Sequence, residues 1–352
     1  MPFADAPPSD IVDALVQRND FLSCVLEGPQ ETPELVEELG VSKSTVDRGM
    51  NALETAGLVE SCNGGYRTTS IGGVVTTDFL AFMESVEKAS RDRGRTREDV
   101  PAVDIVSTVS SRQPVLESLQ AEPKDKPTLV NELGMSRSTI DRSVRELETQ
   151  GLLEYSDGEF MLTSLGESTV SGLSDLRDMI QLQQRLEPVL KWVPDGELDI
   201  DFDLLADAEV ILPESGDPWA MVNRHVKLLK QVDKGCAVLP LTGLHACEAL
   251  HDRITNEGAV FDTVVNADVA ETFQSNPDYT ELVDEMVETD RHDIYVYDGE
   301  IPYFVGVVND TVQIGVDEKG EPRGILESDS PEVAEWAEGK YEEYKQQSQK
   351  LT

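Results

Sequence analysis

The stretch that decides the fold occurs twice, and its first copy begins Leu39-Gly40-Val41-Ser42-Lys43-Ser44-Thr45-Val46-Asp47-Arg48. The second copy begins Leu133-Gly134-Met135-Ser136-Arg137-Ser138-Thr139-Ile140-Asp141-Arg142. The offset is 133 minus 39, or 94 residues, and the match runs without a gap for 34 positions, of which 17 are identical. A period of this length is too long for a solenoid repeat and favours a duplicated small domain.

Each copy predicts the same order of helices and strands. Apolar residues at helical spacing come first, and a short helix then begins near Pro33 or Pro127, because proline in the first turn loses no hydrogen bond. A Leu-Gly turn leads into a third helix, for which Ser42 and Ser136 are suitable N-caps. Two short strands follow, joined by turns that read Cys62-Asn63-Gly64-Gly65 and Ser156-Asp157-Gly158-Glu159. This order predicts two tandem winged helix-turn-helix domains.

Polar residues gather at the start of the third helix of each copy, where a core does not need them. In this motif that end of the helix enters the major groove of DNA, and Ser, Thr and Arg side chains reach base edges and phosphates. The DNA-binding residues that we predict are Ser42, Lys43, Ser44, Thr45, Arg48, Arg67 on the first wing, Ser136, Arg137, Ser138, Thr139, Arg142 and Arg145. The alternative is that these residues only cap and solvate a helix start. The basic segment from Lys88 to Arg97 predicts a linker that lies close to phosphates or is simply solvated.

The repeated pattern resembles the winged-helix regulators of halophilic archaea whose C-terminal half is similar to the sensor domain of methanogenesis regulatory (FilR-like) proteins. The C-terminal residues that carry the likeness are Asp217-Pro218-Trp219, the apolar stretch from Cys236 to Leu241, and the tail from Gly320 to Asp329. The resemblance covers nearly the whole chain. It implies a transcription factor with a sensor domain related to the phospholipase-D-like ligand domain of TrmB-like sugar regulators.

The composition is strongly acidic but still that of a globular protein. Acidic residues outnumber basic ones 69 to 29 in 352 residues, and hydrophobic residues make up 39%. At molar salt the Debye length is about 3 Å, so the repulsion within such a chain is screened. We therefore expect a protein adapted to a salt-rich cytoplasm, with an acidic mesophilic protein as the alternative. The absence of a signal-like N-terminus and of a long apolar run predicts a soluble cytoplasmic protein without a membrane partner.

The C-terminal half alternates short apolar runs with helical stretches, which predicts an α/β layer architecture. The fold class that we expect is therefore α+β and multidomain, with two tandem winged helix-turn-helix domains before an α/β phospholipase-D-like, non-catalytic sensor domain. The expected domains are residues 1–92, 93–190 and 191–352, and one long helix from Ser164 to Leu190 precedes the third. A closing helix is expected from Pro331 to about Gln347.

The C-terminal half offers candidate ligand contacts but no clear catalytic signature. Trp219, Thr242, His245 and Asn266 fall at predicted strand ends or loops and are the predicted ligand-binding residues, with a core role as the alternative for Trp219. His225-Val226-Lys227 begins like a phospholipase D motif, but Val232 stands where the aspartate is required, so we treat the match as coincidence. Cys247 and His251 are four residues apart on a helix, yet two such residues do not close a metal site. We expect no catalytic residues, no metal and no cofactor.

The sequence favours a DNA-binding transcriptional regulator whose C-terminal domain senses a small-molecule effector and changes DNA affinity. The expected partners are double-stranded DNA in promoter regions and that effector. A homodimer through the long helix from Ser164 to Leu190 is a further hypothesis. A dimer would set its recognition helices about one DNA turn, roughly 34 Å, apart, and a monomer with two such helices could do likewise. The alternative function is a winged-helix protein-interaction module fused to a ligand-binding or enzymatic α/β domain.

Overall fold

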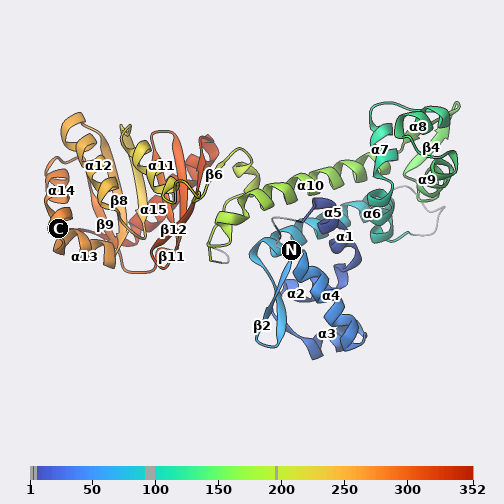
Figure 1. The fold of residues 1–352 in the computed structure, drawn as a ribbon, viewed down its shortest axis with the longest axis horizontal. Coiled ribbons are helices and arrows are strands. Elements are labelled where there is room, and N and C mark those ends of the chain that lie inside the picture. The colour runs from blue at the N-terminus through green and yellow to red at the C-terminus, as the bar shows by residue number, and fades with distance from the viewer. Residues whose placement is uncertain (1–2, 4–5, 92–99, 195–196, 352) are drawn as a thin grey trace. The chain divides into compact units, whose positions relative to one another are not determined.

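The computed structural model describes residues 3, 6–91, 100–194 and 197–351, and it has a mixed α and β fold (Figure 1). Two compact units divide the chain, Met1–Gln184 and Arg185–Thr352. Lys88 and Arg91 of the basic segment lie at the end of a helix, whereas the rest of its basic residues, within 92–99, fall outside the described residues.

The first unit contains two copies of one arrangement. In the first copy, four helices precede a hairpin and a long fifth helix follows: α1 (Pro8–Gln17), α2 (Asn19–Leu26), α3 (Thr32–Leu39), α4 (Lys43–Thr55), β2 (Val59–Cys62), β3 (Gly65–Thr68) and α5 (Ser70–Arg91). The second copy has α6 (Ala102–Ser111), α7 (Gln113–Gln120), α8 (Lys126–Leu133), α9 (Arg137–Thr149), β4 (Leu153–Ser156), β5 (Glu159–Leu162) and α10 (Ser164–Leu190). Apart from the C-terminal end of α10, each bound is shifted by the 94 residues of the sequence repeat, as in 102 minus 8. The duplication thus extends well beyond the matched sequence.

Strand pairing repeats with the same offset. In the first copy, strand β1 (Gln30–Glu31) adds to the hairpin by pairing Gln30 with Tyr66. The equivalent residues of the second copy, Lys124 and Phe160, form an isolated bridge. The hairpin turns have positive φ at Asn63 and Gly64, and again at Asp157 and Gly158. Asn-Gly and Asp-Gly pairs adopt this backbone readily, which explains why the sequence predicted both hairpins.

The helix ends also follow the sequence. Ser42 accepts a hydrogen bond from the Thr45 amide, and Ser136 accepts one from the Thr139 amide, so both predicted N-caps are confirmed. Before each of these helices, Gly40 and Gly134 end α3 and α8 in the left-handed conformation, at φ of 62° and 61°. Glycine adopts this backbone without steric cost.

The two copies share one hydrophobic core. Helix α1 packs on α6 and α5 also contacts α6, and one cluster of buried apolar residues runs from Phe3 to Ile180. The Ser110 hydroxyl donates to Asp13 across the two copies, over 3.2 Å. The first unit is therefore a single packed body that presents α4 and α9 as related helices.

The second unit is built on an eight-stranded sheet in the order β13-β9-β8-β7-β10-β11-β12-β6. Strands β7 to β9 are parallel and the remaining neighbours are antiparallel. The strands are β6 (Glu209–Ile211), β7 (Lys234–Leu239), β8 (Val260–Asn266), β9 (Ile294–Tyr297), β10 (Phe304–Val308), β11 (Thr311–Glu318), β12 (Glu321–Ser328) and β13 (Ser348–Lys350). The short helix η2 spans Phe202–Leu205, and the longer helices are α11 (Ala220–Leu229), α12 (Leu244–Glu257), α13 (Ala267–Ser275), α14 (Pro277–Glu288) and α15 (Pro331–Gln346).

Helices cover both faces of this sheet. Helix α15 contacts β7 to β11 on one face, where Lys345 lies 3.7 Å from Asp262. Helix α11 contacts β12, and α11, α12 and α14 pack on one another on the other face. Side chains alternate along each strand, so Asp262 faces α15 while Phe261 and Thr263 face the α11 and α12 side.

Candidate functional site

The start of α9 presents a row of polar and basic side chains to solvent. Ser136, Arg137, Ser138, Arg142 and Arg145 are all exposed, as is Thr139. The Ser136 hydroxyl lies 2.9 Å from the Ser138 hydroxyl and 2.8 Å from that of Thr139, so the helix start is well ordered by its own side chains. Helix α4 repeats this arrangement with Ser42, Ser44 and Thr45, although Thr45 is half-buried.

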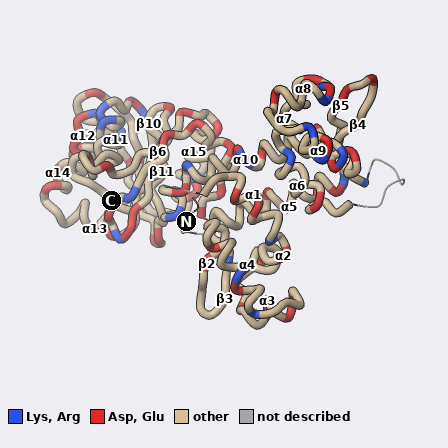
Figure 2. The backbone as a smooth tube through the Cα atoms, turned by 45° about the vertical axis from the view of Figure 1, so that its right-hand side comes forward, with Lys and Arg blue, Asp and Glu red and all other residues tan. Residues whose placement is uncertain are grey.

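Two of the three acidic side chains of α9 are paired with basic residues outside the helix. Lys126 of α8 pairs with Asp141 over 2.5 Å, and Arg112, which precedes α7, pairs with Glu146 over 2.9 Å. The hydrogen bond from Lys126 lowers the pKa of Asp141, so this carboxylate stays ionised. Within the described part of the chain, Arg137, Arg142 and Arg145 form no ion pair. The three arginines of α9, together with Lys126 and Arg112, therefore outnumber the three acidic residues of this helix, in a protein that is acidic overall (Figure 2).

The first copy lacks this charge pattern. Arg67 of the wing is paired with Glu60 over 2.6 Å, and the Arg48 guanidinium donates to the Ser44 carbonyl of its own helix over 3.1 Å. The positions equivalent to Lys126 and Arg145 are Thr32 and Asn51. Of the two helices, α9 is thus better suited to contact an anionic polymer.

A cavity of about 350 Å³ lies in the second unit, between the sheet and the helices α11 and α12. Apolar side chains dominate its wall, including Met221, Leu229, Leu239, Leu250, Phe261, Phe273, Met286, Phe304 and Ile325. Its polar lining comprises Thr242, Thr263, His225, His292 and Cys247, with Asp317 and Glu321 beside the turn between β11 and β12. This volume falls within the usual range of small-molecule pockets.

Two of the four predicted ligand contacts lie at this cavity. Trp219, at the N-terminus of α11, lines it and is 58% exposed, and Thr242 lines it from the loop after β7. His245 points elsewhere, because it is an exposed residue that bonds to Glu248 over 2.9 Å. Asn266 caps α13 by accepting from the Val269 amide and donates to the Pro240 carbonyl, so its amide is already used. Neither His245 nor Asn266 is among the residues that line this cavity, and their part in ligand binding stays a prediction.

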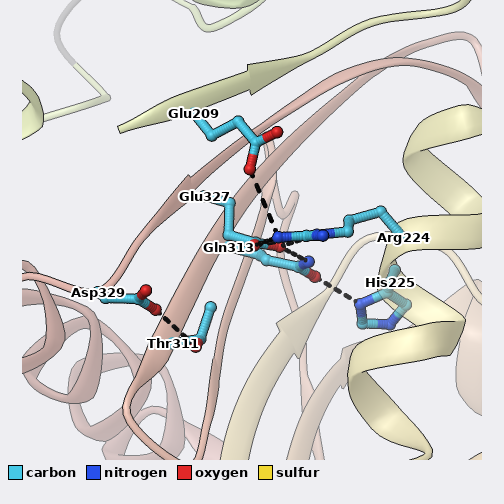
Figure 3. Close-up of polar contacts among 7 residues, drawn as sticks. All are labelled: Glu209, Arg224, His225, Thr311, Gln313, Glu327 and Asp329. Carbon is cyan, nitrogen blue, oxygen red and sulfur yellow. Dashed lines mark hydrogen bonds and ion pairs between the residues drawn. The ribbon is translucent and has the colours of Figure 1, made fainter. Parts of the chain in front are cut away.

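His225, which the sequence offered only as part of a coincidental phospholipase D match, lines the cavity and belongs to the network of polar side chains in Figure 3. Its Nδ1 lies 2.8 Å from Oε1 of Gln313, and the Gln313 amide donates to Glu327 over 2.7 Å. Arg224 binds the same carboxylate through Nε at 3.0 Å. Arg224 also lies 3.4 Å from Glu209 on the edge strand β6.

Burial and hydrogen bonding together set the protonation states of His225 and Glu327. Burial of the His225 ring lowers its pKa, and the bond to Gln313 only partly opposes that effect. Burial alone would raise the pKa of Glu327, but the hydrogen bonds from Arg224 and Gln313 outweigh it and the pKa falls. His225 is therefore neutral, whereas Glu327 is an ionised acceptor.

The second histidine and the cysteine of the cavity are also uncharged. Nδ1 of His292 donates to the Phe261 carbonyl, its Nε2 lies 3.4 Å from the Thr263 hydroxyl, and burial lowers its pKa. Burial raises the pKa of Cys247 to about 11, so this thiol is protonated. His251 bonds to Glu285 over 2.7 Å. Among the described residues no group of three His, Cys, Asp or Glu side chains is placed to hold a metal.

Comparison with protein families supports the division of the chain. The HVO_A0261 N-terminal domain matches residues 9–91 and 101–185, which are the two copies of the repeat. The middle domain of the methanogenesis regulatory protein FilR1 matches residues 218–347. No curated relative matches the chain. Among the helices that the structure describes, none combines the length and apolar character needed to cross a membrane.

Solved structures share only a distant likeness. The archaeal chromatin protein TrmBL2 is 10% identical, at a TM-score of 0.32, over 70% of this chain and 99% of its own. The phospholipase D family member Nuc from Salmonella typhimurium is 13% identical, at a TM-score of 0.32, over 41% of this chain and 97% of its own. NucT from Helicobacter pylori is 10% identical, at a TM-score of 0.33, over 41% of this chain and 98% of its own. These scores are too low to bear on function.

Proposed function

We propose that this chain is a sequence-specific DNA-binding transcriptional regulator, because residues 9–91 and 101–185 match the HVO_A0261 N-terminal domain and residues 218–347 match the middle domain of the methanogenesis regulatory protein FilR1. The two copies of the repeat are tandem winged helix-turn-helix domains in this proposal, and α9 is the principal recognition helix. Residues 191–352 form the domain that senses an effector, after winged-helix domains at 1–92 and 93–190.

The observation that carries the proposal is the N-terminal face of α9. Three exposed arginines of α9 follow the serine and threonine hydroxyls at its N-terminus, and two of its three acidic residues, Asp141 and Glu146, are paired with basic residues of other elements. A helix N-terminus favours a phosphate, and Arg, Ser and Thr are the residue types that bind DNA backbone and bases. The FilR1 match describes a regulatory protein, which agrees with this use.

Chromatin immunoprecipitation of the tagged protein in its native cells tests the proposal. We expect discrete promoter peaks for the unchanged protein and their loss for the double variant Arg137→Glu/Arg142→Glu. The matched control is Lys43→Glu/Arg48→Glu, which changes the equivalent positions of α4 and should retain more of the signal. Diffuse enrichment that is the same for all three proteins would contradict site-specific binding.

Effector sensing is the second part of the proposal. The cavity supports it because it lies between the sheet and the helices α11 and α12, and because its mainly apolar lining includes a few polar side chains. An effector changes DNA affinity only if it binds the two affinity states unequally. We propose a homodimer as the DNA-bound form, which sedimentation with and without DNA would test.

A further inference from the structure

The chemistry of the cavity wall restricts the class of ligand that it accepts. No Lys or Arg is among the described residues that line it, and its two carboxylates, Asp317 and Glu321, belong to one turn. A buried phosphate or carboxylate group without a cationic partner is costly to desolvate. A sugar needs many hydrogen-bonding groups, and Leu239, Leu250 and Phe261 supply none. The wall therefore favours an apolar and uncharged ligand.

The hydrogen bonds around His225 determine which of its two ring nitrogens donates and which accepts. Glu327 is ionised and can only accept, so the Gln313 group that bonds to it must be the NH₂ group. The Gln313 carbonyl then faces His225, and Nδ1 of the ring must donate to it. In the neutral ring the remaining nitrogen, Nε2, is an acceptor. Among the hydrogen bonds of the described residues, none involves this Nε2 atom.

His225 and His292 differ in whether Nε2 already has a hydrogen-bonding neighbour. His292 donates from Nδ1 to the Phe261 carbonyl, which makes its Nε2 an acceptor too, but the Thr263 hydroxyl already lies beside it. The Phe304 ring packs edge-on against His225, with centroids 5.1 Å apart, and holds the imidazole in place. Nε2 of His225 is thus an acceptor with no bonding partner among the described residues, and Thr242 is a further polar residue of the lining.

We propose that the cavity binds an uncharged, largely apolar molecule whose single hydroxyl or N–H group donates a hydrogen bond to Nε2 of His225. This inference rests on the proposed sensing function and names the class of effector. An aromatic or aliphatic alcohol or a phenol has this chemistry, and a molecule with two fused rings is small enough for a cavity of about 350 Å³. Sugars and phosphates are excluded from the class.

Isothermal titration calorimetry on the full chain tests the class with a matched pair of probes. 1-Naphthol carries the donor, and 1-methoxynaphthalene has the same rings but no donor. We expect 1-naphthol to bind at least about 10-fold more tightly, because a good hydrogen bond in a dry site contributes about 1.5 kcal/mol. Equal affinity for the two probes, or binding of glucose or inorganic phosphate in preference to 1-naphthol, would overturn the proposal.

Substitutions at the cavity test whether the two probes bind there. His225→Phe should remove the preference for 1-naphthol, whereas His245→Phe, at an exposed histidine outside the cavity, should leave it unchanged. If His225→Phe does not fold, Ala246→Phe fills the cavity from α12 and should abolish binding of both probes. Retained binding in Ala246→Phe would place the probe elsewhere and contradict the assignment.

The calorimetry is independent of DNA, so its failure differs from failure of the regulatory proposal. Naphthol binding without promoter peaks would support the proposed ligand class and contradict the proposed function as a transcriptional regulator. Promoter peaks without naphthol binding would leave a DNA-binding protein and overturn the ligand class.

Discussion

Two buried histidines tie the stability of the C-terminal unit to pH. Burial lowers the pKa of both His225 and His292 from 6.5, and nearby Asp262 and Asp293 oppose the shift of His292 without cancelling it. The unfolded chain therefore binds more protons than the folded one once the pH falls below about 6.5. The neutral rings make their full contribution to stability above this pH and lose it on acidification.

The free energy of unfolding of this unit should consequently fall between pH 7.5 and pH 5.5, by at most about 1.4 kcal/mol per histidine for each pH unit below 6.5. Urea unfolding of the full chain in salt-rich buffer measures it. His225→Phe removes one titrating ring, so the pH dependence should shrink in this variant. The exposed His245→Phe variant serves as the control and should behave like the unchanged protein. A pH-independent midpoint in the unchanged protein would refute the neutral assignment.

Single residues differ in how far the sequence could predict their roles. Ser42 and Ser136 were recognisable because an N-cap depends on local sequence alone. Asn266 has the same local signal, an Asn directly before a helix, and it caps α13, whereas the sequence led us to predict a ligand contact. Neither His225 nor His292 was predicted as a ligand contact, because the cavity forms only when α11 packs on strands more than 80 residues later in the chain. No local pattern marks such a site.

Among the elements, α5 contains a close contact that only glycine permits. A Cβ atom added at Gly72 would lie 1.9 Å from the Leu58 carbonyl oxygen, and one at Gly166 would lie 2.2 Å from that of Leu152. Both glycines follow a threonine whose hydroxyl bonds to a carbonyl of the preceding turn, at Thr69 and Thr163. This contact joins the wing to the next helix in both copies, which explains why Thr-Ser-x-Gly closes the repeat.

Adjacent glycines of α5 allow a matched test of that contact. Gly72→Ala should destabilise the first unit by at least about 1–3 kcal/mol, because the backbone must move to relieve the overlap. Gly73→Ala has its nearest foreign atom at 3.6 Å and should be neutral or stabilising by up to about 1 kcal/mol, since alanine favours the helix. Thermal unfolding of the two variants gives the comparison. Equal thermal midpoints for the two variants would contradict the close contact between Gly72 and the Leu58 carbonyl.

The sequence predicted the regular elements better than the irregular ones. The long helix from Ser164 to Leu190 and the closing helix from Pro331 have the expected bounds to within a residue, because long amphipathic stretches with clear caps are unambiguous. Strand β12 was not predicted as a strand, since Glu321–Ser328 contains proline, glycine and charged residues. Strand β13 is polar and only three residues long, and its pairing with β9 comes from tertiary structure.

At the scale of the whole molecule, charge is the dominant feature. The formal net charge is -40, and acidic positions are spread over both units (Figure 2). Repulsion among them opposes folding in dilute buffer and is screened once the Debye length falls to about 3 Å at molar salt. The acidic surface thus makes stability depend on salt.

The thermal midpoint should therefore rise by several degrees between 0.1 M and 2 M potassium chloride. Differential scanning calorimetry of the full chain measures this shift. Sucrose at matched osmolality is the control, because it strengthens burial without screening charge. A rise as large in sucrose as in potassium chloride would show that screening is not the cause.

The central claim is that α9 contacts DNA, and fluorescence anisotropy with a labelled fragment from an immunoprecipitated promoter tests it most directly. Arg137→Glu/Arg142→Glu should weaken binding by at least about 30-fold, since each of two lost contacts costs about 1–3 kcal/mol, and Lys43→Glu/Arg48→Glu should weaken it less. Circular dichroism establishes that both variants remain folded. Binding by the folded α9 variant at the affinity of the unchanged protein would contradict the account.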